Sequence, residues 1–296
     1  MSRVVAGIDD EHQPLLPPGR SVWLPGRGDT FVRELDGPAG APSVVLLHGW
    51  TATAGLNWLP CFAPLARHFR VIALDHRGHG RGMRTTTPFT LEDCADDVAA
   101  LARELDIDRF IAVGYSMGGP IAQLLWQRHR GLVDGLVMCA TGCTFRGRSR
   151  ERVLFSMVTG ASAIASTVPL RPLTQSALGA LAGWQRLRGR RWWGLDEVSH
   201  HDWPQIIAAG RELGRFDSQS WVHEIDVPTT VIVTDTDDIV PAQRQRALAA
   251  AIPDASVIVA DGGHDYCTLA AGPFAAQLLV ACKRVASRGA RSLIAA

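Results

Sequence analysis

The chain has 296 residues, with 30 lysine and arginine side chains against 29 aspartate and glutamate side chains, so its formal charge is +1. This length favours one large domain, or one domain with an insertion, over a string of small modules. The near-neutral charge argues against a broad basic surface for nucleic acid, and 47% hydrophobic with 20% charged residues excludes a disordered or collagen-like chain.

The first twenty residues carry acidic side chains where a secretory signal would need a continuous apolar core. No uncharged apolar stretch approaches the roughly 20 residues of a transmembrane helix. We therefore expect a cytoplasmic protein without a transmembrane segment. The six cysteines show neither a C-x-x-C pair nor zinc-finger spacing, which predicts reduced and mostly buried thiols.

Short apolar runs alternate with segments of helical periodicity, which predicts a mostly parallel β-sheet with helices on its faces. Each run is apolar throughout, as expected for a strand that is buried on both sides. Ahead of these runs, residues 21–24 and 30–35 flank a glycine-containing turn and predict an antiparallel hairpin at one edge. The six predicted parallel strands are residues 44–47, 71–74, 110–113, 136–140, 230–233 and 256–259.

A helix is predicted to begin at Thr90. Asp93 stands three residues later and completes a capping box, and apolar residues then recur at helical spacing as far as Leu105. This helix should cover one face of the sheet.

A long insertion is predicted between strands 136–140 and 230–233, because about ninety residues separate them where loops of a few residues are usual. We interpret residues 142–217 as a helical cap over the ends of the strands, where open α/β sheets bind ligands, and residues 1–141 and 218–296 as the core. A peripheral packing element or a homodimer contact is the alternative. The insertion contains a group of tryptophans and arginines, namely Trp184, Trp192, Trp193, Trp203, Arg186, Arg188, Arg190 and Arg191.

Two groups of side chains in the insertion could suggest a ligand site, but we do not predict one at either. The arginine cluster is interpreted as a solvated face, with attraction of an anionic substrate as the alternative. His200, His201 and Asp202 are interpreted as cap surface, because adjacent side chains rarely converge on one metal ion.

A serine between two glycines follows the third predicted parallel strand. Gly114-Tyr115-Ser116-Met117-Gly118 fits G-x-S-x-G, a weak signal by itself in a chain with 29 glycines. The context is more specific, because strand 110–113 runs into the motif and a helical pattern follows it until Gly131. Strand, tight turn and helix predict a nucleophile elbow that holds the Ser116 hydroxyl above the sheet.

A serine nucleophile needs a base within hydrogen-bond reach, and the base needs an acid that orients it. His264 follows the last predicted strand in a glycine-rich loop and is the best placed of the ten histidines. Asp235, Asp237 and Asp238 follow the preceding strand, and each is a candidate for the acid. The predicted order along the chain is serine, aspartate, histidine.

Acyl transfer also needs N–H donors for the oxyanion that develops on the substrate carbonyl. We predict that the backbone N–H groups of Met117, at the start of the elbow helix, and of Trp50, just after strand 44–47, form this oxyanion hole. His48, His76 and His79 are interpreted as structural loop histidines rather than bases.

Five sequence blocks together resemble the α/β-hydrolase fold family, serine hydrolase branch. They occur in order as Leu47-His48-Gly49-Trp50, Asp75-His76-Arg77-Gly78-His79-Gly80, Gly114-Tyr115-Ser116-Met117-Gly118-Gly119, Asp237-Asp238-Ile239-Val240-Pro241 and Gly263-His264. The family pattern D-x-x-V-P implies that Asp237 is the acid. The resemblance also implies that Trp50 and Met117 supply the oxyanion amides and that the insertion is a cap. The family often has glycine where this chain has Thr234.

These features predict an enzyme with a small-molecule acyl or ester substrate, and neither a cofactor nor a metal ion is required. The expected reaction is hydrolysis of a carboxylic ester through an acyl-enzyme on Ser116, with a thioester or an amide as the alternative substrate. The same fold and triad also support a C–C bond hydrolase, a lactonase or a cofactor-free perhydrolase. A ligand-binding sensor that retains the triad is the alternative outside enzymes.

Overall fold

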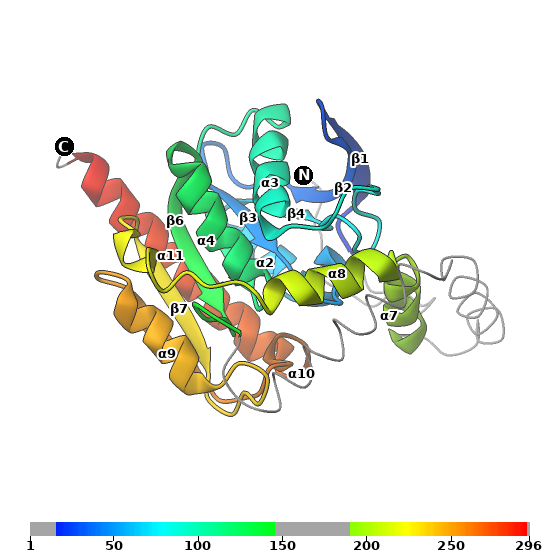
Figure 1. The fold of residues 1–296 in the computed structure, drawn as a ribbon. Coiled ribbons are helices and arrows are strands. Elements are labelled where there is room, and N and C mark those ends of the chain that lie inside the picture. The colour runs from blue at the N-terminus through cyan, green and yellow to red at the C-terminus, as the bar shows by residue number, and fades with distance from the viewer. Residues whose placement is uncertain (1–15, 146–189, 295–296) are drawn as a thin grey trace.

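The computed structural model describes residues 16–145 and 190–294, and their strands form one eight-stranded sheet (Figure 1). The spatial order is β1-β2-β4-β3-β5-β6-β7-β8. Strands β3 to β8 pair in parallel, whereas β1 pairs antiparallel with β2, and β2 with β4. The strands are β1 Gly19–Leu24, β2 Gly28–Leu35, β3 Ser43–Leu47, β4 Arg70–Leu74, β5 Phe110–Tyr115, β6 Val133–Cys139, β7 Thr229–Thr234 and β8 Ser256–Ala260.

The predicted hairpin and all six predicted parallel strands are confirmed, with one correction to their burial. The last strand, β8, is not buried on both faces, since Val257 is 41% exposed and Val259 is 48% exposed. An apolar run predicts a strand, but β8 is the edge strand of the sheet and the packed layers cover it only in part.

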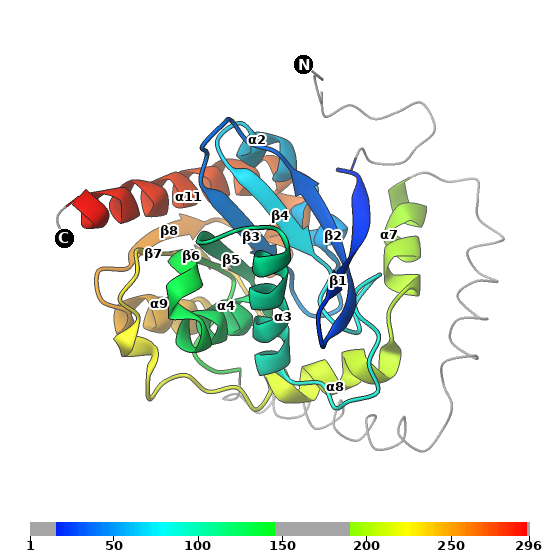
Figure 2. The ribbon, with the colours of Figure 1, turned by 90° about the horizontal axis from the view of Figure 1, so that it is seen from above.

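Helices cover both faces of the sheet (Figure 2). The helices α3, α4 and α9 pack on one face, and α1, α2, α10 and α11 pack on the other, so that alternate residues of the central strands enter two separate cores. The described helices are α1 Ala54–Trp58, α2 Phe62–Ala66, α3 Leu91–Glu104, α4 Gly118–Arg128, α7 Arg190–Ser199, α8 Trp203–Leu213, α9 Ala242–Ala251, α10 Tyr266–Leu269 and α11 Ala271–Ile294.

The helix predicted at Thr90 begins as expected. The Thr90 hydroxyl oxygen accepts a hydrogen bond from the backbone N–H of Asp93 at 3.0 Å, and the Thr90 hydroxyl donates to the Asp93 carboxylate at 2.9 Å. The helix after the elbow ends at Arg128, three residues before Gly131. Gly131 itself lies in a short 3₁₀ turn, Arg130–Leu132, that follows the helix.

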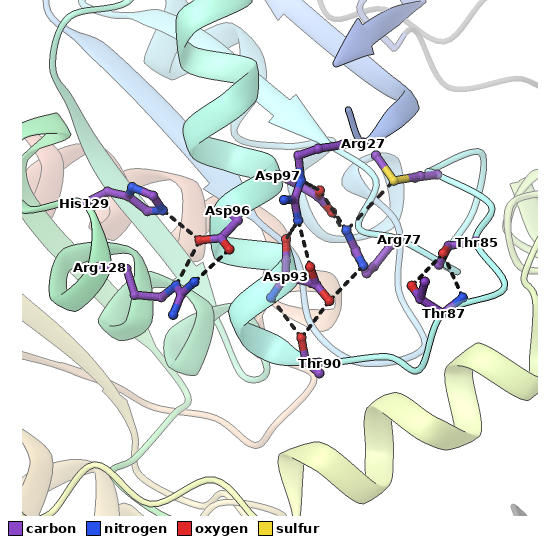
Figure 3. Close-up of polar contacts among 11 residues, drawn as sticks. Arg27, Arg77, Thr85, Thr87, Thr90, Asp93, Asp96, Asp97, Arg128 and His129 are labelled. Atoms are coloured by element: carbon purple, nitrogen blue, oxygen red, sulfur yellow. Dashed lines mark hydrogen bonds and ion pairs between the residues drawn. The ribbon is translucent and has the colours of Figure 1, made fainter. Parts of the chain in front are cut away.

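A group of ion pairs ties the loop after β4 to α3 and to the β1–β2 turn, as Figure 3 shows. Arg77 makes a two-pronged contact with Asp97, at 2.8 and 2.9 Å, and both side chains are buried. Arg27 of the hairpin turn contacts Asp97 and also Asp93. A planar guanidinium that pairs with a carboxylate through two bonds has a fixed geometry. These contacts therefore hold the loop after β4 against α3 and the β1–β2 turn.

The predicted cap is described only in part, through residues 142–145 and 190–217. Trp184, Arg186 and Arg188 lie outside the described residues, as do the side chains of Arg190, Arg191 and Trp192. The described part contains α7 and α8, and the division of the chain into core and cap stays a prediction.

Two expectations from composition can be compared with the fold. All six cysteines are unpaired and buried, as predicted. Among helices in the described part of the chain, none has both the length and the apolar character that crossing a bilayer requires.

Candidate active site

Ser116 lies at the turn between β5 and α4 with a backbone φ of 50°. This left-handed conformation is rare for a residue with a Cβ, so the surrounding structure must hold it in place. The N–H of Ser116 donates to the carbonyl of Cys139 at 2.9 Å, and its carbonyl accepts from the Thr141 hydroxyl at 2.9 Å. Bonds from β6 and the segment after it therefore fix the backbone that carries the predicted nucleophile.

The glycines of the motif allow very close backbone approach. A Cβ at Gly118 would lie 2.0 Å from the carbonyl oxygen of Leu47, and one at Gly114 would lie 2.2 Å from the carbonyl oxygen of Gly118. Neither contact is sterically possible, so any larger residue must displace the elbow from β3. The spacing of G-x-S-x-G thus has a direct steric cause in this fold.

The structure brings Ser116, His264 and Asp237 together, although they lie far apart in the sequence. Nε2 of His264 is 2.9 Å from Oγ of Ser116, and Nδ1 of His264 is 2.9 Å from Oδ2 of Asp237. Asp235 and Asp238 are exposed and do not take this place, and Asp235 instead pairs with Arg246 at 2.7 Å.

The Asp237 carboxylate lies in a buried site with many donors. Its Oδ1 accepts from the backbone N–H groups of Ile239 and Val240, each at 2.8 Å. Its Oδ2 accepts from the Thr234 hydroxyl at 2.8 Å and from Nε2 of Gln245 at 3.2 Å, besides His264. Burial by itself raises the pKa of Asp237, but these hydrogen bonds and the nearby His264 outweigh burial and lower it below its ordinary value.

An ionised Asp237 accepts the Nδ1–H of His264, which leaves Nε2 of the neutral ring as a proton acceptor toward Ser116. Neither Thr234, which stands where the family often has glycine, nor Gln245 was predicted from the sequence as a partner of this carboxylate. The signal for Gln245 is a polar residue at a buried position of α9, in the first turns after the aspartate loop.

The two predicted oxyanion amides lie beside Ser116. A Cβ at Gly49, the residue before Trp50, would contact the Cβ of Ser116 at 3.4 Å, and Met117 immediately precedes α4. Outside regular helices and strands, no backbone hydrogen bond among the described residues uses the N–H of Trp50 or Met117. The role of these two N–H groups as oxyanion donors stays a prediction.

The histidines near the site are buried and act as packing elements. His48 is enclosed with its ring against His76 and His79, at centroid distances of 4.4 and 5.2 Å. Burial lowers the pKa of His48 to about 3, and the pKa values of His76 and His79 fall well below their ordinary value for the same reason. The three rings therefore stay neutral at pH 7, in agreement with a structural role.

The surface interpretation of the His200-His201-Asp202 segment is wrong for two of its residues, because His201 and Asp202 are buried. His201 faces the core loops, where Nδ1 lies 2.8 Å from the N–H of Gly80 and Nε2 lies 3.1 Å from the carbonyl of Thr51. Within the described ranges, no group of three or more histidine, cysteine, aspartate or glutamate residues is arranged to hold a metal ion.

Comparisons with known proteins agree with this architecture. The model of the alpha/beta hydrolase fold family matches residues 42–267. A putative carbamate hydrolase, RutD, of Caulobacter sp. (strain K31) is 29% identical over 263 residues, which cover 86% of this chain and 96% of that protein.

Two solved structures show the same fold. The enol-lactonase from Burkholderia xenovorans LB400 superposes with a TM-score of 0.71 at 24% identity, over 88% of this chain and 98% of that one. The esterase EaEST from Exiguobacterium antarcticum superposes with a TM-score of 0.73 at 19% identity, over 90% of this chain and all of the other, at 100%. The chain belongs to the α/β-hydrolase fold family, and the hydrolases among its relatives support a hydrolytic activity.

Proposed function

We propose that the protein is a serine hydrolase that cleaves carboxylic esters of small-molecule substrates through an acyl-enzyme. The observation that carries this proposal is the continuous chain of contacts from Ser116 through His264 to the buried Asp237, with 2.9 Å at each step. A serine hydroxyl bonded to a neutral imidazole, which is oriented by an ionised carboxylate, is the arrangement that activates the hydroxyl at neutral pH.

In the proposed reaction, Oγ of Ser116 attacks the ester carbonyl carbon while Nε2 of His264 takes the hydroxyl proton. The N–H groups of Trp50 and Met117 donate to the oxyanion of the tetrahedral intermediate. The intermediate collapses, His264 gives its proton to the departing alcohol, and an ester of Ser116 remains. A water molecule, deprotonated by His264, then attacks this ester and releases the carboxylic acid and the free serine.

A carbamate is the second candidate substrate, favoured by the relative named as a putative carbamate hydrolase. A carbamate carbonyl undergoes the same attack by Ser116 and forms the same kind of tetrahedral intermediate, so this chemistry needs no further residue. The choice between the two is a matter of relative kcat/KM, which depends on contacts to the leaving group.

The test compares wild type, Ser116→Ala and the control Ser220→Ala, which changes an exposed serine. Each is incubated with a fluorophosphonate probe and assayed on p-nitrophenyl esters from acetate to laurate and on a p-nitrophenyl carbamate. We expect labelling of wild type and the control, none of Ser116→Ala, and a fall in ester kcat/KM of about 10⁴-fold or more for that variant.

Hydrolysis that persists in a clean preparation of Ser116→Ala would contradict the assignment of the nucleophile. Labelling of Ser116 without turnover of esters or carbamates would instead favour the C–C hydrolase, lactonase or perhydrolase alternatives. Absence of labelling together with tight ligand binding in calorimetry would favour the sensor.

A further inference from the structure

The described part of the predicted cap is bonded to the segment that carries one proposed oxyanion donor. We call residues 49–53 the Trp50 segment. Nε1 of Trp50 donates to the carbonyl of Ile206 in α8 at 2.8 Å, and the Thr53 hydroxyl donates to Glu197 of α7 at 2.5 Å. Between these two contacts, His201 in the turn from α7 to α8 approaches the carbonyl of Thr51.

The tautomer of His201 follows from its two partners. Nδ1 lies 2.8 Å from the backbone N–H of Gly80, which can only donate, so Nδ1 is an acceptor without a proton. Nε2 then carries the proton and donates to the carbonyl of Thr51 at 3.1 Å. Burial lowers the pKa of His201, so the ring is neutral at pH 7 and keeps both roles.

The backbone of the Trp50 segment has a conformation that depends on such contacts. Thr51 has a φ of 59°, a left-handed value that a β-branched residue rarely adopts and that persists only where surrounding contacts impose it. On the core side, the N–H of Gly49 donates to Asn57 at 2.7 Å. The Gly49 carbonyl belongs to the same peptide unit as the Trp50 N–H. It lies 2.8 Å from Nδ1 of His48 and accepts from the N–H of Ala52 at 3.3 Å. His201 contacts the carbonyl of Thr51, in the peptide unit that supplies this Ala52 N–H.

We propose that His201 is a positioning residue that holds the Trp50 N–H toward Ser116, so that the insertion completes the oxyanion hole rather than only covering the site. This inference rests on the proposed function. Its physical basis is that His201 contacts the Thr51 carbonyl, and the N–H of the same peptide unit, on Ala52, donates to the Gly49 carbonyl of the Trp50 peptide unit. Without the bond to Thr51, the left-handed turn at this residue is held less firmly, so the Trp50 N–H is oriented less well toward the position of the oxyanion.

Two amide substitutions of His201 separate its two bonds. The side-chain amide of asparagine reaches about as far as Nδ1, so His201→Asn keeps an acceptor for Gly80 and loses the donor to Thr51. The longer glutamine reaches about as far as Nε2, so His201→Gln keeps a donor for Thr51. Both variants are neutral and polar, which makes them matched controls for each other.

We would measure ester kcat and KM together with the affinity of a boronic acid, which forms a tetrahedral adduct on Ser116 and so needs the oxyanion donors. For His201→Asn we expect kcat to fall by about 10²-fold with a parallel loss of boronate affinity, and KM to change by less than about threefold. For His201→Gln we expect both quantities to stay within about fivefold of wild type.

If His201→Asn unfolds, Trp50→Phe removes the bond to Ile206 from the same segment and should show the same pattern of lower kcat and weaker boronate binding. Equal boronate affinity in wild type and in folded His201→Asn, with only a lower Tm, overturns the inference and leaves the proposed function intact. Absence of both boronate binding and fluorophosphonate labelling in the wild type overturns the proposed function and this inference together.

Discussion

The environment of single side chains distinguishes Asp237 from its two acidic neighbours. Asp235 and Asp238 are exposed, and Asp235 pairs with Arg246. The side chain of Asp237 has 0% exposure and accepts hydrogen bonds on both oxygens. A carboxylate that is buried but supplied with donors stays ionised and has one orientation, which is what the acid of such a triad requires.

Asp237→Asn is expected to lower ester kcat by about 10³- to 10⁴-fold with little change in KM. The asparagine oxygen would stay with the N–H groups of Ile239 and Val240, so the side-chain NH2 would face Nδ1 of His264. Nδ1 would then accept and the proton would move to Nε2, which is the wrong tautomer for a base toward Ser116. Asp238→Asn, one residue away on an exposed side chain, is the control and should leave kcat within about twofold. Steady-state kinetics on a p-nitrophenyl ester checks both, and a similar loss in the two variants would contradict the role of Asp237.

At the scale of elements, the site depends on how closely α4 approaches β3. The turn at Ser116 joins β5 to α4, and Gly118 at the first position of α4 lies against the backbone of Leu47 at the end of β3. The Trp50 segment begins two residues after the end of β3. The contact between the helix and the strand therefore sets the separation between the proposed nucleophile and one proposed oxyanion donor.

Gly118→Ala is expected to lower the free energy of unfolding by about 2 to 3 kcal/mol and to abolish most labelling by the fluorophosphonate probe. The new Cβ would lie 2.0 Å from the Leu47 carbonyl oxygen, so the start of α4 must move and carry Ser116 with it. Gly131→Ala is the matched control, because nothing lies within 4 Å of a Cβ at that position. Urea unfolding and probe labelling of the two variants measure the difference, and an equally small effect in both would refute the steric argument.

At the scale of the whole molecule, buried histidines link stability to pH. His48, His76 and His79 have pKa values lowered by burial, so the unfolded chain binds more protons than the folded one below about pH 6.5. Stability is then lost as the pH falls through this range. Burial acts in the opposite direction on Asp75, whose pKa is raised to about 6, so this carboxyl takes up a proton in the folded state and offsets part of the loss.

We expect the free energy of unfolding to be lower at pH 5.5 than at pH 7.5, by an amount on the order of a few kcal/mol, because the buried histidines take up protons only in the unfolded chain. Urea unfolding at the two pH values measures it. His76→Leu should weaken the pH dependence, because it removes one of the buried histidines. Neither ring nitrogen of His76 has a hydrogen-bond partner among the described residues, so the substitution breaks no side-chain hydrogen bond. An unchanged pH dependence in this variant would show that His76 is not a source of the effect.

The strands, the elbow and the order of the triad candidates could be predicted from the amino-acid sequence. Periodicity in runs such as 44–47 and the glycines on both sides of Ser116 reflect local requirements of backbone and burial, so they can be read without knowing the neighbours. His264 was also predictable, because a loop at the end of a parallel strand meets the other strand ends at one edge of the sheet.

Contacts between segments that are distant in the sequence could not be predicted in this way. The residues alone left Asp235, Asp237 and Asp238 open and the family resemblance pointed to Asp237, which is the one that contacts His264 in the structure. The structure also placed Gln245 behind that carboxylate, and it buried His201 against the Trp50 segment where the sequence predicted a surface. Burial and hydrogen-bond partners are properties of packing between elements. A local pattern records which side chain is present, and the packed fold determines what surrounds it.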